Sequence, residues 1–554
     1  MTSIGYPYVR REINDLKKNH PEAWTLFIRG LLAFQQMDQS DPLSYYRISG
    51  IHGRPHVPWQ DALGAENPGG QGYCPHNNIM FTVWHRPYVA LFEQELFKQV
   101  KKIAYNYTVD QRRWIMAADS FRIPYWDWAL GQQGDEFPDI FTNPLATVTG
   151  PNGTLVTLPN PLYQYRFHPT SSQDFDSPWA QMNTTLRCPT SHAFDAESQE
   201  QQVRKQYIEQ RRGIHDGIAK AFNSSTYNEF AAELEMNHGL VHFLAGCVDP
   251  YSGHFWDSEY SAFDPIFMLV HANADRLMAM YQAVHPNTWL EPKSSDAAGN
   301  FWIPRDTELN ANTQMQPFWK DDLSFYTPNE VRNITVLGYA YPETQYWLYP
   351  TAEYWRMDVN KTIALRYSPS ARGILTELRD KEGNIDSHVL VDNSFVDWNI
   401  KTRALLSDLP PTFYVTFSFN GTASSEASRQ VGTWTRQVTG QSSGRSRDDL
   451  EIPQKTDLVN NAQHYLEYSI SLTSSLLDQI AAGKLKSLDA SDVVPYLRDH
   501  LTSQIKAGDN SFVPKPDSFS VEVSSTKVHI PEDAALALEY GGESTSYPEV
   551  KGIM

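Results

Sequence analysis

Cysteine is scarce in this sequence. Only three cysteines, Cys74, Cys188 and Cys247, occur among 554 residues. They are too few and too scattered for the disulfide framework that small secreted domains use. The hydrophobic fraction is 41% and the aromatic fraction 13%, which is ample for a large core. The sequence therefore predicts a fold held by packing, and its length favours two domains, one of them large.

Long apolar runs are also missing. No stretch approaches the roughly 18 apolar residues that a membrane-spanning helix needs. The N-terminal residues through Trp24 contain no apolar signal-peptide core. These two absences predict an intracellular protein without a membrane span, with the cytoplasm as its location.

Basic residues are outnumbered by acidic ones. Lys and Arg total 46 against 65 Asp and Glu, which gives a net charge of -19. A nucleic-acid partner is thereby disfavoured, because no broad basic face would neutralise phosphates. The expected partner is a small molecule, and a homo-oligomer is left open.

What the sequence does contain is histidine at regular spacing. His238 and His242 are four residues apart in the apolar-periodic segment 230–244, which predicts a helix with both imidazoles on one face. A second predicted helix starts near Pro265 and carries His271. Phe267 lies four residues before His271 and Asp275 four residues after it, so all three share a face.

A further group of histidines lies near the N-terminus. His52 directly precedes a glycine, His76 lies just before a predicted helix, and His85 lies on that helix. Three neutral imidazoles per metal, without cysteine or carboxylate ligands, suit copper or zinc. The competing interpretation of each histidine is a packed or surface side chain. His254, which follows Gly253, is either a pocket wall or part of a plain loop.

The C-terminal part has a different pattern. Alternating runs at 412–419, 465–472 and 519–523 predict strands, and 475–505 predicts one or two short helices. Residues 366–390 are charged and predict an exposed linker. We therefore expect a mainly α catalytic domain over 1–365, a linker with a maturation cleavage site over 366–394, and a β-sandwich-like domain over 395–554.

Four stretches together resemble the two copper motifs of fungal tyrosinases, which are type-3 binuclear copper proteins. They are Tyr73-Cys74-x-His76, Trp84-His85-Arg86-Pro87-Tyr88, Glu235-x-x-His238-x-x-x-His242 and Asp264-Pro265-Ile266-Phe267-x-x-x-His271-x-Asn273-x-Asp275-Arg276. Their order, their spacings and a closing Tyr339-x-Tyr341 all match. The resemblance is strong over about residues 5–350 and looser in the C-terminal part.

This resemblance implies a four-helix bundle that holds two copper ions, with O2 as co-substrate and o-quinones as products. The first copper would be held by His52, His76 and His85, and the second by His238, His242 and His271. Cys74 matches the cysteine that similar enzymes join to the second histidine, here His76, by a thioether bond. Phe267, Asp275 and His254 would support the ligands from behind.

Three departures from the family pattern stand out. Gly239 stands where good monophenol hydroxylases often have Asn, which helps the upstream Glu, here Glu235, to hold a proton-accepting water. Val270 stands where relatives often have a second histidine. No cysteine follows Cys247, so the Cys-x-x-Cys thought to help load copper in some relatives is absent. We expect catechols to be better substrates than monophenols.

The predicted function is a polyphenol oxidase of the tyrosinase family, which oxidises o-diphenols to o-quinones with O2 and also hydroxylates monophenols. It would act in pigment or melanin formation or in phenolic secondary metabolism. We expect it to be a zymogen that its C-terminal domain keeps latent, with Trp434, on the loop 421–459, as the residue that blocks the pocket. The alternatives are a catechol oxidase or o-aminophenol oxidase with little monophenolase activity, a haemocyanin-like O2 carrier and, lacking the expected carboxylate, a zinc hydrolase.

Overall fold

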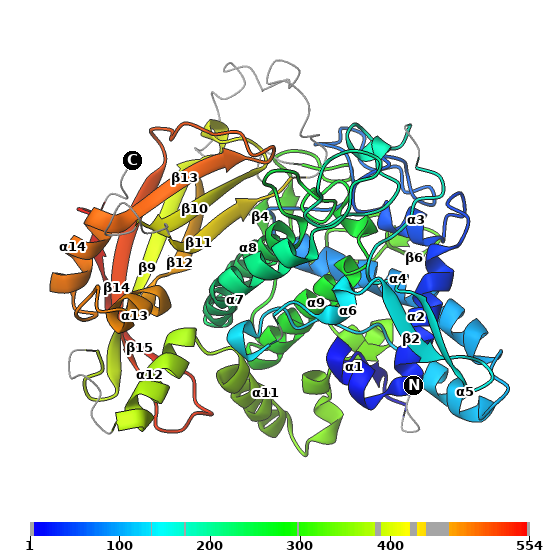
Figure 1. Cartoon of the computed structure of the whole chain (residues 1–554), viewed down its shortest axis with the longest axis horizontal. Coiled ribbons are helices and arrows are strands. Elements are labelled where there is room, and N and C mark those ends of the chain that lie inside the picture. Colours follow the sequence, from blue (N-terminus) through cyan, green and yellow to red (C-terminus); the bar gives the residue numbers. More distant parts are fainter. Residues whose placement is uncertain are drawn as a thin grey trace.

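The computed structural model has a helical part and a β-rich part that lie side by side (Figure 1). It describes residues 5–134, 136–170, 173–295, 299–382, 389–420, 429–438 and 465–550. The helical part runs from the N-terminus to about residue 366, and the β-rich part follows it. Each part has its own cluster of buried apolar side chains. The predicted combination of a mainly α domain and a β-rich domain is confirmed.

A bundle of four helices forms the centre of the helical part. Helix α4 packs against α2, α8 and α9, and α8 also contacts α9. Thr226 and Glu229 form a reciprocal capping box that fixes where α8 begins. The helices of this part are α1 (Ile13–Asn19), α2 (Pro21–Gln35), α3 (Tyr45–Ser49), α4 (Phe81–Ala104), α5 (Gln111–Asp119), α6 (Asp139–Thr142), α7 (Glu200–Phe222), α8 (Tyr227–Gly246), α9 (Phe267–Val284), α10 (Pro328–Val331) and α11 (Ala352–Arg366).

Short strands tie the loops of the helical part together. The parallel pair β1–β8 joins the N-terminus to the Tyr339-x-Tyr341 segment, with Tyr8 opposite Tyr339. The other short strands form three antiparallel pairs: β2–β3, β4–β5 and β6–β7. Their bounds are β1 (Tyr8–Val9), β2 (Leu145–Thr149), β3 (Leu155–Pro159), β4 (Lys293–Ser294), β5 (Glu308–Leu309), β6 (Trp319–Asp321), β7 (Ser324–Phe325) and β8 (Tyr339–Ala340).

Two antiparallel sheets build the β-rich part, in the orders β11-β10-β13 and β12-β9-β14-β15. Both sheets contribute side chains to one shared core, for example Phe417 from β10 and Ile400 from β9, as in a sandwich. Strand β11 also contacts helix α8 of the bundle. The elements are β9 (Ser394–Leu405), β10 (Phe413–Phe419), β11 (Arg429–Arg436), β12 (Tyr465–Ser471), α13 (Thr473–Ala481), α14 (Ala490–His500), β13 (Leu501–Ala507), β14 (Ser520–His529) and β15 (Glu539–Tyr547).

The segment expected to be an exposed linker instead contains helix α12 (Ser370–Glu382). Ala371 and Leu375, one helical turn apart, are buried in the core of the β-rich part. Arg372 donates from Nη1 to the carbonyl oxygen of Leu536 at 2.7 Å. The charged residues that suggested a linker therefore lie on a helix whose apolar side is anchored in the core of the β-rich part. Residues 383–388 of the expected linker lie outside the described residues.

Trp434 does not lie on a loop, and the prediction that it blocks the pocket is wrong. It belongs to strand β11 and is 2% exposed. Its ring packs 5.0 Å from the ring of Phe413 and 6.3 Å from that of Tyr468, inside the β-rich core. Because side chains alternate along a strand, the next residue, Thr435, faces the other way, toward α8. The remainder of the expected loop, 421–428 and 439–459, lies outside the described residues.

Candidate metal centre

Two clusters of buried side chains in the helical part have the geometry of metal sites. One consists of His52, Cys74 and His85, and the other of the three histidines His238, His242 and His271. Within each cluster the ligand atoms all lie within 4.8 Å of one another. His76 borders the first cluster, with its Nε2 3.7 Å from the sulfur of Cys74 and its ring 5.2 Å from that of His52.

The imidazoles come from two kinds of backbone. His85, His238, His242 and His271 project from helices α4, α8 and α9, as their spacing predicts. His52 and His76 instead lie in turns that precede α4. The two clusters face each other, because the rings of His85 and His271 stack with their centroids 3.9 Å apart. The arrangement therefore places two groups of ligands at a single centre.

Backbone carbonyl groups fix the orientation of three imidazoles. The Nδ1 atoms of His85, His52 and His242 donate to the carbonyl oxygens of Phe81 at 2.7 Å, Ser258 at 2.8 Å and Phe255 at 2.6 Å, respectively. A carbonyl oxygen only accepts, so Nδ1 carries the proton in each ring. The lone pair of Nε2 is then available to a metal ion.

The histidine triad His238, His242 and His271 is arranged for a cation. Its Nε2 atoms converge, with His242 2.8 Å and His271 3.0 Å from His238. Burial lowers the pKa of His242 to about 4 and those of His238 and His271 well below the usual value, so the rings are neutral. Three neutral rings whose nitrogen atoms converge in a buried space fit a metal ion such as copper or zinc.

Of the two residues on α9 predicted to support the ligands, Phe267 contacts the ligand rings, whereas Asp275 bonds to residues that are not proposed ligands. The ring of Phe267 packs 4.2 Å from that of His271 and 4.9 Å from that of His52, so it touches both clusters. Asp275 accepts from Arg86 Nε at 2.6 Å and from the hydroxyls of Tyr339 at 2.6 Å and Tyr341 at 2.8 Å. Burial alone would raise the pKa of Asp275, but Arg86 and Arg10 hold it below its usual value.

His254 takes a different place from the one predicted. Its ring packs on Trp179, with centroids 4.8 Å apart, and its Nδ1 accepts from the backbone N–H of Leu186 at 3.1 Å. The supporting contact to the metal ligands comes from the next residue, Phe255, whose carbonyl oxygen holds His242. The role of a backbone carbonyl cannot be read from a sequence, so the prediction named the neighbouring histidine instead.

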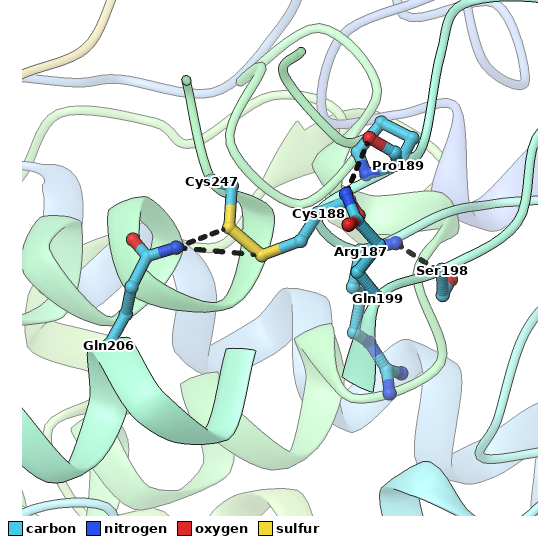
Figure 2. Close-up of a disulfide and its surroundings, with 7 residues drawn as sticks. All are labelled: Arg187, Cys188, Pro189, Ser198, Gln199, Gln206 and Cys247. Carbon is cyan, nitrogen blue, oxygen red and sulfur yellow. Dashed lines mark hydrogen bonds between the residues drawn. A yellow bond between two sulfur atoms is a disulfide. The ribbon is translucent and has the colours of Figure 1, made fainter. Parts of the chain in front are cut away.

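A clamp that the sequence does not predict joins the two helices of the second cluster, and Figure 2 shows its disulfide. Arg187 forms a bidentate pair with Asp264 at the start of α9, at 2.7 and 2.8 Å. The next residue, Cys188, forms a disulfide with Cys247, which directly follows α8. The amide of Gln206 lies beside both sulfur atoms. Disulfides are typical of oxidising compartments, so this one does not support the predicted cytoplasmic location.

Residues of the β-rich part lie over the face of α8 that carries the ligands. A Cβ atom added to Gly239 would lie 2.9 Å from the hydroxyl oxygen of Thr435. The buried carboxyl of Glu235 accepts from the backbone N–H of Asn77 at 2.5 Å. Asn77 in turn donates from its side chain to the carbonyl oxygen of Gln437 at 2.7 Å. Burial raises the pKa of Glu235 to about 8, although Asn77 and Arg436 lower it.

No helix among the described residues is both long and apolar enough to cross a membrane.

Comparison with known proteins gives two family matches. Residues 42–284 match the common central domain of tyrosinase, and residues 397–525 match the tyrosinase C-terminal domain. The first region contains all six histidines and Cys74. The second begins within strand β9 and ends within strand β14.

Individual relatives agree with these matches. Tyrosinase from Neurospora crassa is 27% identical over 671 residues, covering 99% of this chain and 96% of that protein. Tyrosinase from Podospora anserina is 33% identical over 387 residues, covering 65% of this chain and 66% of that protein. The structure of latent and active mushroom tyrosinase shares the fold, with a TM-score of 0.81 at 24% identity over 99% of this chain and 97% of that one. The chain belongs to the family of fungal tyrosinases and polyphenol oxidases, whose type-3 binuclear copper site the two facing clusters fit.

Proposed function

We propose that this protein oxidises o-diphenols to o-quinones with O2, and that its C-terminal domain keeps it latent. The observation that carries the proposal is the pair of facing, buried ligand clusters with residues of the β-rich part lying over them. Pigment formation or phenolic secondary metabolism would supply the substrate, and a small phenol is the expected partner.

The six imidazoles have separate tasks in this proposal. His52, His76 and His85 would hold the first copper, and the triad of His238, His242 and His271 the second. When bound, the copper pair supplies the redox chemistry that takes two electrons from the diphenol to O2. The protein keeps the ligands neutral and buried, and the ring of Phe267 fills the space behind them.

Glu235 is the proposed proton acceptor for the incoming phenol. It lies one helical turn before His238, on the ligand-bearing helix α8. A phenol has a pKa near 10, so it reaches the centre as the neutral form and must lose its proton there. One oxygen of the Glu235 carboxyl accepts from Asn77. The other would take that proton, directly or through one water, when the carboxyl is ionised, and the pKa of about 8 favours this form only above about pH 8.

Latency is proposed to arise from the segment 435–438 of the β-rich part. Thr435 lies against Gly239, and Gln437 is bonded to Asn77, which directly follows His76. A phenol that approaches this face of α8 would meet these residues first. Undocking of the β-rich part, after a cut between α12 and β9, would open the same face to substrate.

The test is catechol-dependent O2 uptake by the copper-loaded full chain before and after specific cleavage. A protease recognition sequence replaces residues 383–388, and the C-terminal fragment is removed after cleavage. We expect steady O2 consumption to rise several-fold on removal, with His242→Ala as the inactive control. Reversible O2 binding without consumption would instead identify an O2 carrier, and equal uptake before and after removal would exclude latency.

The lack of a side chain at Gly239 supports a second candidate, a catechol oxidase or o-aminophenol oxidase with little monophenolase activity. An amide at this position would give the water beside Glu235 a second anchor, which glycine does not provide. Turnover of matched monophenols, catechols and o-aminophenols by the trimmed enzyme separates the candidates. Equal rates on a monophenol and its catechol would favour a full tyrosinase.

A further inference from the structure

One short segment supports an imidazole on each side of the centre. Residues 255–258, which we call the strap, connect the end of the α8 region to the loop before α9. The carbonyl oxygen of Phe255 accepts from His242 Nδ1 at 2.6 Å. The carbonyl oxygen of Ser258 accepts from His52 Nδ1 at 2.8 Å. A shift of the strap would therefore turn one ligand ring in each half of the centre.

The other side of the strap is bonded to the β-rich part. Gln437 donates from Nε2 to the carbonyl oxygen of Trp256 at 2.6 Å. The hydroxyl of Ser258 donates to the carbonyl oxygen of Val438 at 3.0 Å. The indole N–H of Trp256 donates to the carbonyl oxygen of Gly508 at 3.3 Å. Along the strap, the first and last carbonyl groups thus hold metal ligands, and the carbonyl group of Trp256 between them accepts from the second domain.

Gln437 reaches a third ligand by a separate contact. Its backbone carbonyl oxygen accepts from the side chain of Asn77 at 2.7 Å, and Asn77 directly follows His76. Through its side-chain amide it holds the strap, and through its backbone carbonyl it holds the loop of His76. Gln437 is 7% exposed, so both bonds are made away from bulk water. This one residue contacts the supports of three of the six imidazoles.

We infer that the C-terminal domain is part of the scaffold that orients the metal ligands, with Gln437 as its positioning residue, so that metal binding and domain docking are coupled. The inference rests on the proposed assignment of the six imidazoles as ligands. Groups that hold the outer nitrogen of a ligand histidine set its orientation and its affinity for the metal. Such coupling is reciprocal: if docking strengthens metal binding, then metal binding strengthens docking to the same degree.

A domain that only covered the pocket would behave differently. It would block substrate without touching the supports of His52, His76 and His242, and metal binding would leave its docking unchanged. The two cases therefore differ in whether binding of a metal ion at the centre strengthens the docking of strand β11 and the residues that follow it.

The first experiment measures hydrogen exchange in the full chain, metal-free and loaded with Zn²⁺, which binds imidazole but has no redox chemistry. We expect Zn²⁺ to slow exchange in peptides that cover the strap and also in those that cover 429–438. Peptides of the distant strand β15 provide the internal control. Slower exchange in the strap with no change at 429–438 would overturn the inference.

The second experiment measures the rate at which a chelator removes Zn²⁺ from the full chain. Gln437→Met keeps the length of the side chain and removes its donor, and we expect loss of metal to become about 10-fold faster. Gln430→Met, on strand β11, which ends just before Gln437, serves as the matched control. Ser258→Ala removes a second bond between the strap and the β-rich part and should act in the same direction, which keeps the test valid if Gln437→Met folds poorly. Unchanged metal loss in a folded Gln437→Met or Ser258→Ala chain would refute the inference.

Neither readout requires catalysis, so the two proposals fail separately. A chain that shows the coupling but consumes no O2 with catechol would refute the proposed oxidase function alone. A chain that is activated by trimming but shows no coupling would refute the scaffold role of Gln437 alone.

Discussion

The two halves of the metal centre are built in different ways. The second half takes all three imidazoles from helices α8 and α9, and the pair Arg187–Asp264 and the disulfide Cys188–Cys247 tie these helices together. The first half takes one imidazole from helix α4 and two from turns. A helix fixes the backbone that carries its ligands by its own hydrogen bonds, whereas the backbone of a turn depends on distant contacts. The second half should therefore resist local changes that disturb the first.

Removing a ligand from either half should give the largest effect. We expect His242→Ala and His85→Ala each to lower the copper content from about two ions per chain and to abolish O2 uptake by the trimmed enzyme. Even the loss of a group behind a ligand costs about 10–100-fold in affinity or activity. Elemental analysis and O2 uptake are the measurements. Normal turnover in either variant would show that the residue is not a ligand.

Breaking the ionic clamp of the second half should destabilise the protein strongly. Arg187→Met leaves the carboxylate of Asp264 buried without its partner, which costs about 3–5 kcal/mol. The control is Arg204→Met, because Arg204 pairs with the exposed Asp139, and such surface pairs contribute about 0–1 kcal/mol. Urea unfolding of both variants gives the comparison, and equal stabilities would show that the clamp has no structural role.

Removing the covalent clamp should cost somewhat less. The double variant Cys188→Ser/Cys247→Ser opens a loop whose ends are 59 residues apart, and native disulfides typically contribute about 2–4 kcal/mol. We expect a lower midpoint of thermal unfolding and faster loss of the second copper than of the first. Mass spectrometry of the purified wild type without reductant provides the check, since two alkylatable thiols at these positions would show that the disulfide is absent.

These differences also explain what the sequence predicts well. The four-residue spacing of His238 and His242, and of Phe267, His271 and Asp275, follows from helical periodicity, and the structure confirms the faces that it predicts. Arg187 lies 77 residues from Asp264, and the carbonyl groups of Phe255 and Ser258 have no side-chain signal, so these supports depend on the tertiary fold. Trp434 was placed on a loop because strand β11 lies within a stretch rich in Ser, Gly and Arg, which hides the strand pattern.

The first half of the centre should contain a covalent support of its own. Cys74 Sγ lies 3.7 Å from His76 Nε2 and 3.5 Å from His85 Nε2, so both rings are near, but only His76 lies on a turn that needs fixing. We expect a thioether between Cys74 and a ring carbon of His76. Bond formation removes one hydrogen from each residue, with O2 as the oxidant at the copper centre. The intact mass should fall by two hydrogens after copper loading, but not in Cys74→Ser.

A fully active enzyme in which the thiol of Cys74 still reacts with an alkylating reagent would contradict this thioether. A crosslinked peptide that contains His85 in place of His76 would place the bond on helix α4. The thioether would then not be a device that fixes a ligand on a turn.

The smallest expected effect concerns Gly239, where the two domains meet. In the docked chain, a side chain at this position would press on the hydroxyl of Thr435, because even a Cβ atom would lie 2.9 Å from it. We therefore expect Gly239→Asn to weaken docking and to raise the residual catechol-dependent O2 uptake of the uncut chain. Gly239→Ala, which adds only the Cβ atom, should have a smaller effect in the same direction.

In the trimmed enzyme, which lacks the contact with Thr435, the same substitution should affect only the removal of the proton from the phenol. The amide would give the water beside Glu235 a second anchor, and a positioned base typically contributes about 10²–10⁴-fold to proton removal. Catechols need this help less, since bidentate approach to copper favours loss of their first proton. The ratio of monophenol to diphenol turnover should rise several-fold in Gly239→Asn. If the uncut chain becomes more active while this ratio stays constant, then Gly239 serves the contact between the domains and not the choice of substrate.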